Sequence, residues 1–338
     1  MKKTLAQLAQ HVGGKVKGNA DIEVDSVATL DNATGTDISF LSNPKYTNAL
    51  QTTKAGAVII GKDTDAPVPL LICEDPYYAF SQIVVLLHGY RQHTDVGVSP
   101  KAGIAKTAKI GKSCIINDFA TIGDEAVIGD NVIIYPGVFI GNNVKIGDNC
   151  ILYPNAVIYD GCRLGNNVII NANATIGKDG YGYATHKGKH YKIPQVGVVV
   201  IENDVEIGAN CCIQRGAIED TIIGEGCKFG DIINIGHGAK IGAYCLLVGQ
   251  VGVAGSTTIG HHCVIAAQVG IVGHIKIGNM VRIAAQAGVI NDVPDGAAIA
   301  GTPAISALNA KRAYSMFEDL PEMKKKIRKI EKQIENGK

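Results

Sequence analysis

The feature that most constrains this chain is an aliphatic residue that recurs at every sixth position. From Ile110 to Ile176 the period holds for twelve consecutive repeats, and after Ile201 and a four-residue offset it runs from Ile223 to Val289. An α-helix brings a side chain back to one face about every 3.6 residues and a strand about every two, so neither keeps such a period. Hexapeptide repeats are typical of a parallel β-helix, in which short strands wind into triangular coils that stack. The sequence therefore predicts a mainly β fold of this kind.

A second position in each repeat supports the same fold. Two residues before each aliphatic residue stands a small or β-branched residue, which fits the narrow interior of a coil. Seven of the nine cysteines occupy this position: Cys114, Cys150, Cys162, Cys211, Cys227, Cys245 and Cys263. The odd total and the lack of a CxxC pair argue against disulfides and a metal site, so we expect small buried hydrophobic residues.

The composition excludes several classes of protein. A formal net charge of +1 and an aromatic content of 5% argue against a nucleic-acid-binding protein. No run of about 18 apolar residues exists to cross a membrane, and the start, MKKTLAQLAQ, lacks the apolar stretch of a signal peptide. With its thiols unpaired, the protein is expected in the reducing cytoplasm.

The 338 residues are expected to form three parts. Residues 1–96 predict a small α/β domain, 97–304 the β-helix, and 305–338 a helical tail. The elements expected in the first part are helices over 5–12 and 77–87 and strands near 22–27, 57–60 and 70–73. Residues 178–198 interrupt the repeats and are rich in Gly, Tyr, Lys and His. We expect them to form an ordered excursion over one face of the coils.

The tail carries two signals. Met323, Ile327, Ile330 and Ile334 are spaced as on a coiled-coil seam, and isoleucine at both core positions favours three or more strands, so a homotrimer is expected. Residues 305–338 also hold nine Lys or Arg against five Asp or Glu. This excess is either a solvated helix face or a docking surface for an acidic partner.

The strongest candidate for catalysis is His237, because Gly236 and Gly238 leave its side chain uncrowded. Histidine is the natural general base near neutral pH. Gly255 follows eighteen residues later, one coil on, and stacked coils are separated by about 4.8 Å. A base beside a backbone N–H is the minimum arrangement for acyl transfer. His274 lies about two coils after His237, near the same edge. The alternative that His237 is an ordinary exposed surface histidine stays open.

A zinc site of the kind found in β-helical carbonic anhydrases is the competing interpretation. Catalytic zinc needs three protein ligands. His237 and His274 supply two nitrogens, but no further histidine follows in the repeats and position 279 is Asn. The sequence therefore predicts no metal site.

The chain also resembles, over essentially its whole length, the UDP-3-O-acylglucosamine N-acyltransferase family of lipid A biosynthesis. The most specific match is the segment SFLSNPKY at residues 39–46, and further matches lie at 180–184, 192–195, 215–217 and 220–224. The resemblance implies a left-handed parallel β-helix of about ten coils. It also implies that Phe40 and Tyr46 flank a uracil base while Asn43 hydrogen-bonds to it. Two rings around an Asn-Pro turn make a reasonable stacking clamp, although without the resemblance they would be satellite core residues.

The resemblance further implies that His237 is the catalytic base, Gly255 the oxyanion donor and His274 a second active-site histidine. The chain departs from the family at Gly230-Asp231, where many members have Asp-Asn. The carboxylate that orients the imidazole is thus absent at position 230, and whether Asp231 replaces it stays open.

The function implied is the transfer of a 3-hydroxyacyl group from acyl carrier protein to the 2-amine of UDP-3-O-(3-hydroxyacyl)glucosamine. The product would be UDP-2,3-diacylglucosamine, and no cofactor is expected beyond the phosphopantetheine that carries the acyl group. One alternative is an O-acyltransferase acting on UDP-N-acetylglucosamine, but that family lacks a counterpart of residues 1–96. The other is a catalytically silent hexapeptide-repeat scaffold.

Overall fold

The structure is a computed structural model that describes residues 2–302, 304 and 306–336. Met1, Pro303, Ile305, Gly337 and Lys338 lie outside the described residues, and with them the predicted start of the first domain and both predicted ends of the tail. The chain divides into two compact units, Met1–Thr94 and Asp95–Lys338.

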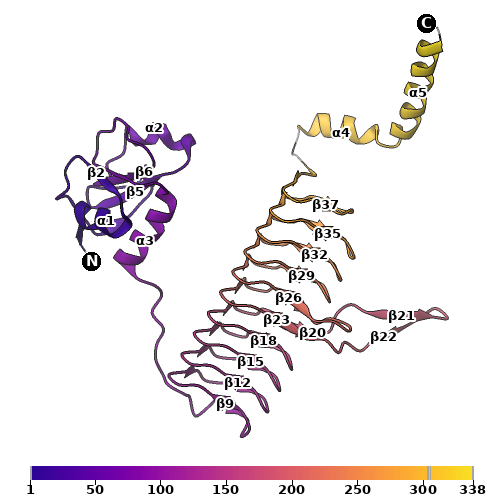
Figure 1. Cartoon of the computed structure of the whole chain (residues 1–338), viewed down its shortest axis with the longest axis horizontal. Coiled ribbons are helices and arrows are strands. Elements are labelled where there is room, and N and C mark those ends of the chain that lie inside the picture. The colour runs from indigo at the N-terminus through magenta and orange to yellow at the C-terminus, as the bar shows by residue number, and fades with distance from the viewer. Residues whose placement is uncertain (1, 303, 305, 337–338) are drawn as a thin grey trace. The chain divides into compact units, whose positions relative to one another are not determined.

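The first unit is built around a five-stranded sheet flanked by helices (Figure 1). Its strands, in sheet order, are β2 (Lys15–Lys17), β7 (Leu70–Ile72), β6 (Ala57–Ile60), β5 (Asp37–Leu41) and β4 (Ser26–Val27). The remaining elements are β1 (Lys3–Thr4), β3 (Glu23–Val24), α1 (Leu5–Val12), the 3-10 helix η1 (Pro44–Tyr46), α2 (Thr47–Leu50) and α3 (Pro76–His88). Both predicted helices and the strands near 22–27, 57–60 and 70–73 are confirmed. β1, β2, β5, η1 and α2 were not predicted, and β5 is an interior strand that pairs with β4 and β6.

Local sequence explains where the first helix begins and ends. Thr4 and Gln7 form a capping box at the start of α1, and Gly13 ends the helix with a φ of 67° that suits glycine. Leu5 and Leu8, one turn apart, are fully buried against the sheet. The helical spacing read in the sequence is therefore the spacing of a core-facing stripe.

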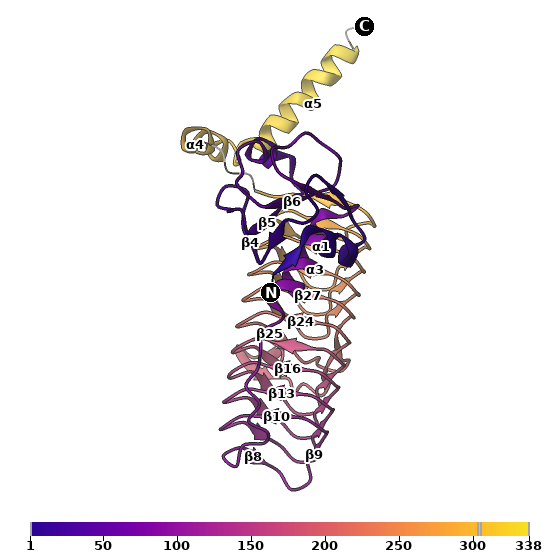
Figure 2. The ribbon, with the colours of Figure 1, turned by 90° about the vertical axis from the view of Figure 1, so that its left-hand side faces the viewer.

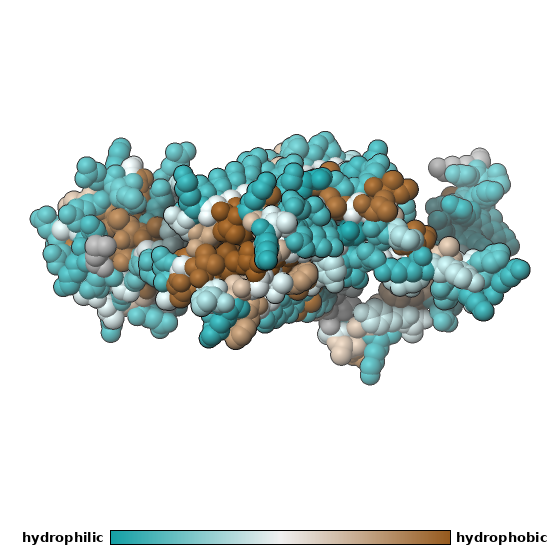
Figure 3. All heavy atoms as spheres, turned by 90° about the horizontal axis from the view of Figure 1, so that it is seen from below, coloured by the Kyte–Doolittle hydropathy of each residue, from teal (hydrophilic) through white to brown (hydrophobic). Residues whose placement is uncertain are grey.

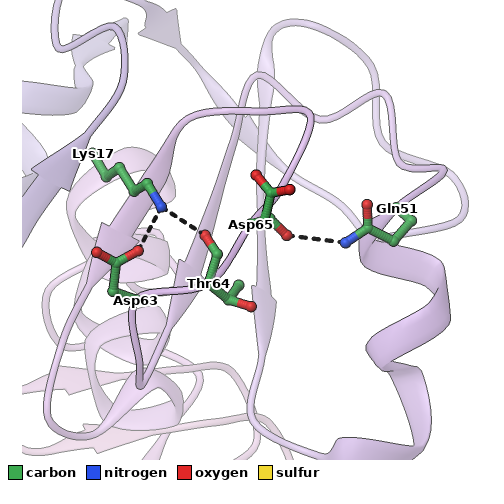
Figure 4. Close-up of polar contacts among 5 residues, drawn as sticks. All are labelled: Lys17, Gln51, Asp63, Thr64 and Asp65. Carbon is green, nitrogen blue, oxygen red and sulfur yellow. Dashed lines mark hydrogen bonds and ion pairs between the residues drawn. The ribbon is translucent and has the colours of Figure 1, made fainter.

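Side-chain hydrogen bonds fix the loop between β6 and β7 (Figure 4). Lys17 Nζ donates to Asp63 Oδ1 at 2.6 Å and to the Thr64 carbonyl at 2.9 Å. Gln51 Nε2 donates to the Asp65 carbonyl at 3.0 Å. These contacts hold the far end of the loop against β2 and the end of α2.

The second unit is a parallel β-helix with three sheets of ten, ten and nine strands, in agreement with the predicted fold and about ten coils (Figure 2). Sheet one contains β10 (Ile115–Ile116), β13 (Ile133–Ile134), β16 (Ile151–Leu152), β19 (Ile169–Ile170), β24 (Glu206–Ile207), β27 (Lys228–Phe229), β30 (Leu246–Leu247), β33 (Val264–Ile265), β36 (Arg282–Ile283) and β38 (Ala298–Ile299). Sheet two contains β8 (Gly103–Ile104), β11 (Thr121–Ile122), β14 (Phe139–Ile140), β17 (Val157–Ile158), β20 (Thr175–Lys178), β25 (Cys212–Gln214), β28 (Asn234–Ile235), β31 (Gly252–Val253), β34 (Gly270–Ile271) and β37 (Gly288–Val289). Sheet three contains β9 (Lys109–Ile110), β12 (Val127–Ile128), β15 (Lys145–Ile146), β18 (Arg163–Leu164), β23 (Val199–Ile201), β26 (Thr221–Ile223), β29 (Lys240–Ile241), β32 (Thr258–Ile259) and β35 (Lys276–Ile277).

The corners of the coils are held by a ladder of Asp and Asn side chains that the sequence analysis did not identify. Asp130 Oδ1 accepts from the Lys112 N–H at 2.7 Å, Asp148 Oδ1 accepts from the Asp130 N–H at 2.7 Å, and Asn166 Oδ1 accepts from the Asp148 N–H at 2.8 Å. The residue after each of these is often an asparagine with positive φ, such as Asn131 at 56°, a conformation that asparagine tolerates better than most residues. The Gly-Asp/Asn-Asn sequences thus specify the corners, as the aliphatic residues specify the interior.

The cysteines confirm the interpretation made from their spacing. All nine are free thiols, and the seven in the repeat position are buried in the interior of the coils. Burial raises the pKa of the Cys150 thiol to about 11. Such thiols act as small hydrophobic core residues.

The interruption at 178–198 is a β-hairpin of β21 (Tyr183–His186) and β22 (Lys189–Lys192). Instead of lying along one face of the coils, as expected, the hairpin projects from them, and all its strand residues are exposed (Figure 1). The tail forms α4 (Ala307–Ser315) and α5 (Leu320–Asn336). None of the described helices is both long and apolar enough to span a membrane.

Candidate active site

His237 lies at the corner that joins β28 to β29, and its imidazole lies against Gly255 in the next coil. A Cβ on Gly255 would lie 2.6 Å from His237 Nε2 and 2.8 Å from Cε1, where real Cβ atoms essentially never approach. Only glycine at position 255 leaves room for the ring in this position. The one-coil spacing in the sequence is therefore a direct contact in the structure.

The Gly255 N–H is close to the same ring and takes no part in the backbone ladder. The N–H groups on either side donate to carbonyls, from Ala254 to Ile271 and from Ser256 to His237. No acceptor among the described residues is assigned to the Gly255 N–H. A Cβ on Gly236 would lie 2.5 Å from the Gly255 nitrogen, so glycine at 236 keeps that side of the nitrogen clear. The corner thus combines a base with an unused N–H donor.

His274 lies at the same corner, one coil beyond Gly255. Its N–H donates to the Gly255 carbonyl at 3.2 Å, and its side chain is exposed. The structure therefore stacks the three predicted residues His237, Gly255 and His274 in successive coils along one edge.

The pocket in front of His237 has a volume of about 370 Å³ and includes two charged residues that the sequence analysis missed. Lys240 Nζ and Glu219 Oε2 form an ion pair at 2.6 Å. Hydrogen bonding to Lys240 lowers the pKa of the Glu219 carboxyl. Glu219 belongs to the four-residue offset before Ile223, so the irregularity in the hexads was the signal that could have located it.

Asp231 does not orient the imidazole within the chain. Gly230 and Asp231 occupy the corner between β27 and β28, whereas His237 occupies the corner at the other end of β28. The Asp231 carboxylate accepts a hydrogen bond from the Ala209 N–H at 2.8 Å. Within one chain, a strand of the coil therefore separates the two residues.

The beginning of the excursion packs on the other side of His237. A Cβ on Gly180 would lie 2.5 Å from the His237 Cβ and 2.7 Å from Gln195 Oε1. Gly180 and Gln195, from the two ends of the excursion, therefore meet beside the histidine. Both belong to residues 178–198, none of which was predicted to be in the active site.

An outward-facing groove begins in the coil of His237 and runs toward the C-terminal coils. Its floor is a column of glycines, Gly252, Gly270 and Gly288, whose missing Cβ atoms would meet nothing within 4 Å. Apolar side chains that line it are Ala254, Val272 and Ile290, and its volume is about 470 Å³. The groove is suited to an extended apolar chain.

The three residues of the predicted uridine site line a separate pocket of about 430 Å³ in the first unit. Phe40 is half-buried, Tyr46 is exposed, and Asn43 Oδ1 accepts from the Lys45 N–H at 3.0 Å as it caps η1. Tyr77, at the start of α3, adds a ring whose centroid lies 5.5 Å from that of Phe40. Tyr77 was predicted to lie in a helix but not in this pocket.

Comparisons with known proteins first show the class of protein to which the chain belongs. The family model described as bacterial transferase hexapeptide (six repeats) matches residues 107–142 and 143–178. The solved structure of an Arabidopsis UDP-N-acetylglucosamine acyltransferase matches with a TM-score of 0.56 and 25% identity, covering 60% of this chain and 71% of that one. The fold is that of a hexapeptide-repeat acyltransferase.

The family follows from closer matches. The model described as UDP-3-O-(3-hydroxymyristoyl) glucosamine N-acyltransferase, LpxD, matches residues 21–86. A protein of Geobacter sp. (strain M21), named UDP-3-O-acylglucosamine N-acyltransferase, is 51% identical over 99% of this chain and 97% of its own. A protein of the same name from Syntrophotalea carbinolica is 46% identical over 98% and 97%. The chain belongs to the UDP-3-O-acylglucosamine N-acyltransferase family and is an N-acyltransferase of lipid A biosynthesis, which sets aside the O-acyltransferase and silent-scaffold alternatives.

Proposed function

We propose that the enzyme transfers a 3-hydroxyacyl group from the phosphopantetheine of acyl carrier protein to the 2-amine of UDP-3-O-(3-hydroxyacyl)glucosamine. The product is UDP-2,3-diacylglucosamine. The observation that carries the proposal is the His237 imidazole packed on Gly255, whose N–H has no assigned acceptor among the described residues. The names of the relatives support the choice of acceptor sugar.

The chemistry needs only the groups at this corner. His237 Nε2 removes a proton from the 2-amine while the amine nitrogen attacks the thioester carbonyl carbon. The carbonyl oxygen becomes an oxyanion that accepts a hydrogen bond from the Gly255 N–H. The tetrahedral intermediate then collapses to an amide, and the leaving phosphopantetheine thiolate takes the proton from the imidazolium. His274 helps to position the substrate, and no further cofactor or metal takes part.

The glycine-floored groove accommodates the acyl chain. Three coil steps separate Asn234 from Gly288 along the groove, a length of roughly 14 Å at one strand spacing per coil. Apolar walls without charged residues make the groove a better environment for methylene groups than water. The thioester at the head of the chain then lies in the coil of His237.

The pocket of the first unit binds the uridine. Phe40 and Tyr46 contact the faces of the uracil ring, Asn43 hydrogen-bonds to its edge, and Tyr77 extends the aromatic wall. Stacking on tyrosine and phenylalanine gives affinity without ordering long flexible side chains.

The protein is proposed to work as a homotrimer in the cytoplasm, with acyl carrier protein as its partner. Apolar side chains stay exposed on the coils, among them Phe139 and Leu246, and Figure 3 shows apolar side chains gathered on one face. The apolar seam of α5 is also exposed, from Met323 to Ile334. Both surfaces favour packing against further copies of the chain, which light scattering will test. The nine free thiols suit a reducing compartment.

Replacement of His237 by alanine tests the proposed chemistry. Acyl transfer from loaded carrier to the UDP-sugar should fall roughly 10²- to 10⁴-fold, the usual contribution of a general base. The circular dichroism spectrum and the unfolding temperature should stay unchanged, since the imidazole is only half-buried. Turnover within a few-fold of the unmodified enzyme would refute the role of His237.

A further inference from the structure

Gln195 carries a buried polar atom without a partner. Its side chain lies where the excursion returns to the coils and is 7% exposed. The amide nitrogen Nε2 donates to the Ile193 carbonyl at 2.9 Å, but no described group donates to Oε1. A buried acceptor left unpaired is destabilising, so its position requires an explanation.

The unpaired oxygen lies beside the imidazole of His237. The position that a Cβ on Gly180 would occupy is 2.7 Å from Gln195 Oε1 and 3.0 Å from His237 Cγ. At the opposite end of the ring, Nε2 faces Gly255. Nδ1 and Cδ2 are both bonded to Cγ, so Nδ1 is one of the two ring atoms at this end of the imidazole. Glycine at 180 leaves no side chain between the amide oxygen and the ring.

Gln214, the other buried glutamine near the excursion, forms hydrogen bonds through both ends of its amide. Gln214 Oε1 accepts from the Tyr181 N–H at 3.4 Å, and Gln214 Nε2 donates to Asn234 Oδ1 at 3.4 Å. Gln214 therefore has partners for both ends of its amide, in contrast to Gln195. It serves as the matched comparison for Gln195.

The charged groups around His237 form ion pairs or hydrogen bonds with groups other than the imidazole. Glu219 pairs with Lys240 in the pocket, and Asp179 pairs with Lys192 on the excursion. The Arg215 guanidinium donates to backbone carbonyls of two neighbouring coils. The carboxylates near the ring are thus held by lysines, and no hydrogen bond joins either of them to the imidazole among the described residues.

We propose that Gln195 is a positioning residue for His237, with its Oε1 accepting a hydrogen bond from the His237 Nδ1–H. The inference rests on the proposed role of His237 as the base. The hydrogen bond made by one ring nitrogen sets the tautomer of the other, so this contact keeps the lone pair on Nε2, beside Gly255. Catalytic hydrogen bonds are often long in a free enzyme and shorten when substrate binds. Gln195 thus orients the imidazole from the end of the excursion rather than from the coil of His237.

Two near-isosteric variants, Gln195→Met and Gln195→Glu, test the inference. Gln214→Met is the matched control. Diethyl pyrocarbonate modifies the neutral imidazole, so the extent of modification of the His237 peptide against pH gives the pKa of His237 without reference to turnover. Loss of the acceptor in Gln195→Met should lower the pKa of His237 and reduce kcat about tenfold, with KM for both substrates unchanged. The carboxylate of Gln195→Glu should raise the pKa of His237 and move the acidic limb of the kcat profile to higher pH. Gln214→Met should leave the pKa of His237 at its unmodified value.

Different results would overturn the catalytic role of His237 and the positioning role of Gln195. Normal turnover in His237→Ala would overturn the proposed function. An inactive His237→Ala variant, together with an unchanged titration of His237 in both Gln195 variants, would overturn the positioning role alone. Circular dichroism confirms that each variant is folded, and agreement of either Gln195 variant with the predicted shift supports the inference.

Discussion

Replacement of Gly255 by alanine tests the contact on which the proposed mechanism depends. The new Cβ would lie 2.6 Å from His237 Nε2, whereas ordinary Cβ contacts begin at 3.4 Å. The imidazole must therefore move by about 1 Å, a displacement that can reduce turnover about 10²-fold. The backbone N–H remains, so the loss comes from the misplaced base. Stability should change by less than about 1 kcal/mol, because the half-exposed ring can turn toward solvent.

The assay is acyl transfer from loaded carrier protein, with kcat and KM measured separately. We expect kcat to fall while KM for the UDP-sugar stays constant, since the uridine pocket is in the other unit. Gly35→Ala is the control, because a Cβ on Gly35 would meet nothing within 4 Å. A Gly255→Ala enzyme with turnover within about threefold of the unmodified enzyme would show that His237 does not work from this position.

Three further predictions follow from the pocket of the first unit, the tail and the core. Phe40→Ala or Tyr46→Ala should raise KM for the UDP-sugar with little change in kcat. If uridine nucleotides failed to compete with the substrate, this pocket would not be the uridine site. Reversal of Lys311 and Arg312 to Glu should slow binding of the acidic carrier protein and weaken its dependence on salt. An unaltered KM for the carrier at low ionic strength would show that the tail contributes to trimerisation only and does not bind the carrier. Because burial raises the pKa of Cys150 to about 11, its thiol should stay protonated and unreactive toward Ellman's reagent at pH 8 until guanidinium unfolds the protein. Fast reaction of Cys150 in the native protein would contradict its burial.

The sequence alone determined the β-helix and its core. A side chain that enters the interior once in six residues is a property of the covalent order, so Ile134 and Cys150 could be assigned to the core before the structure was known. The spacing of eighteen residues likewise placed Gly255 beside His237. The hand of the coils was not determined in this way, because a hexapeptide spacing is the same for either hand.

The tertiary structure decided which groups surround the histidine. Asp231 is six residues from His237 in sequence but occupies a different corner, whereas Gln195, more than forty residues away, lies beside its ring. Repeat spacing fixes the position of a residue only while the coil continues without interruption. The path of the 178–198 excursion depends instead on packing between residues distant in sequence, such as Gly180 against His237. No local pattern encodes a contact of that kind, because its energy exists only once the coils have stacked.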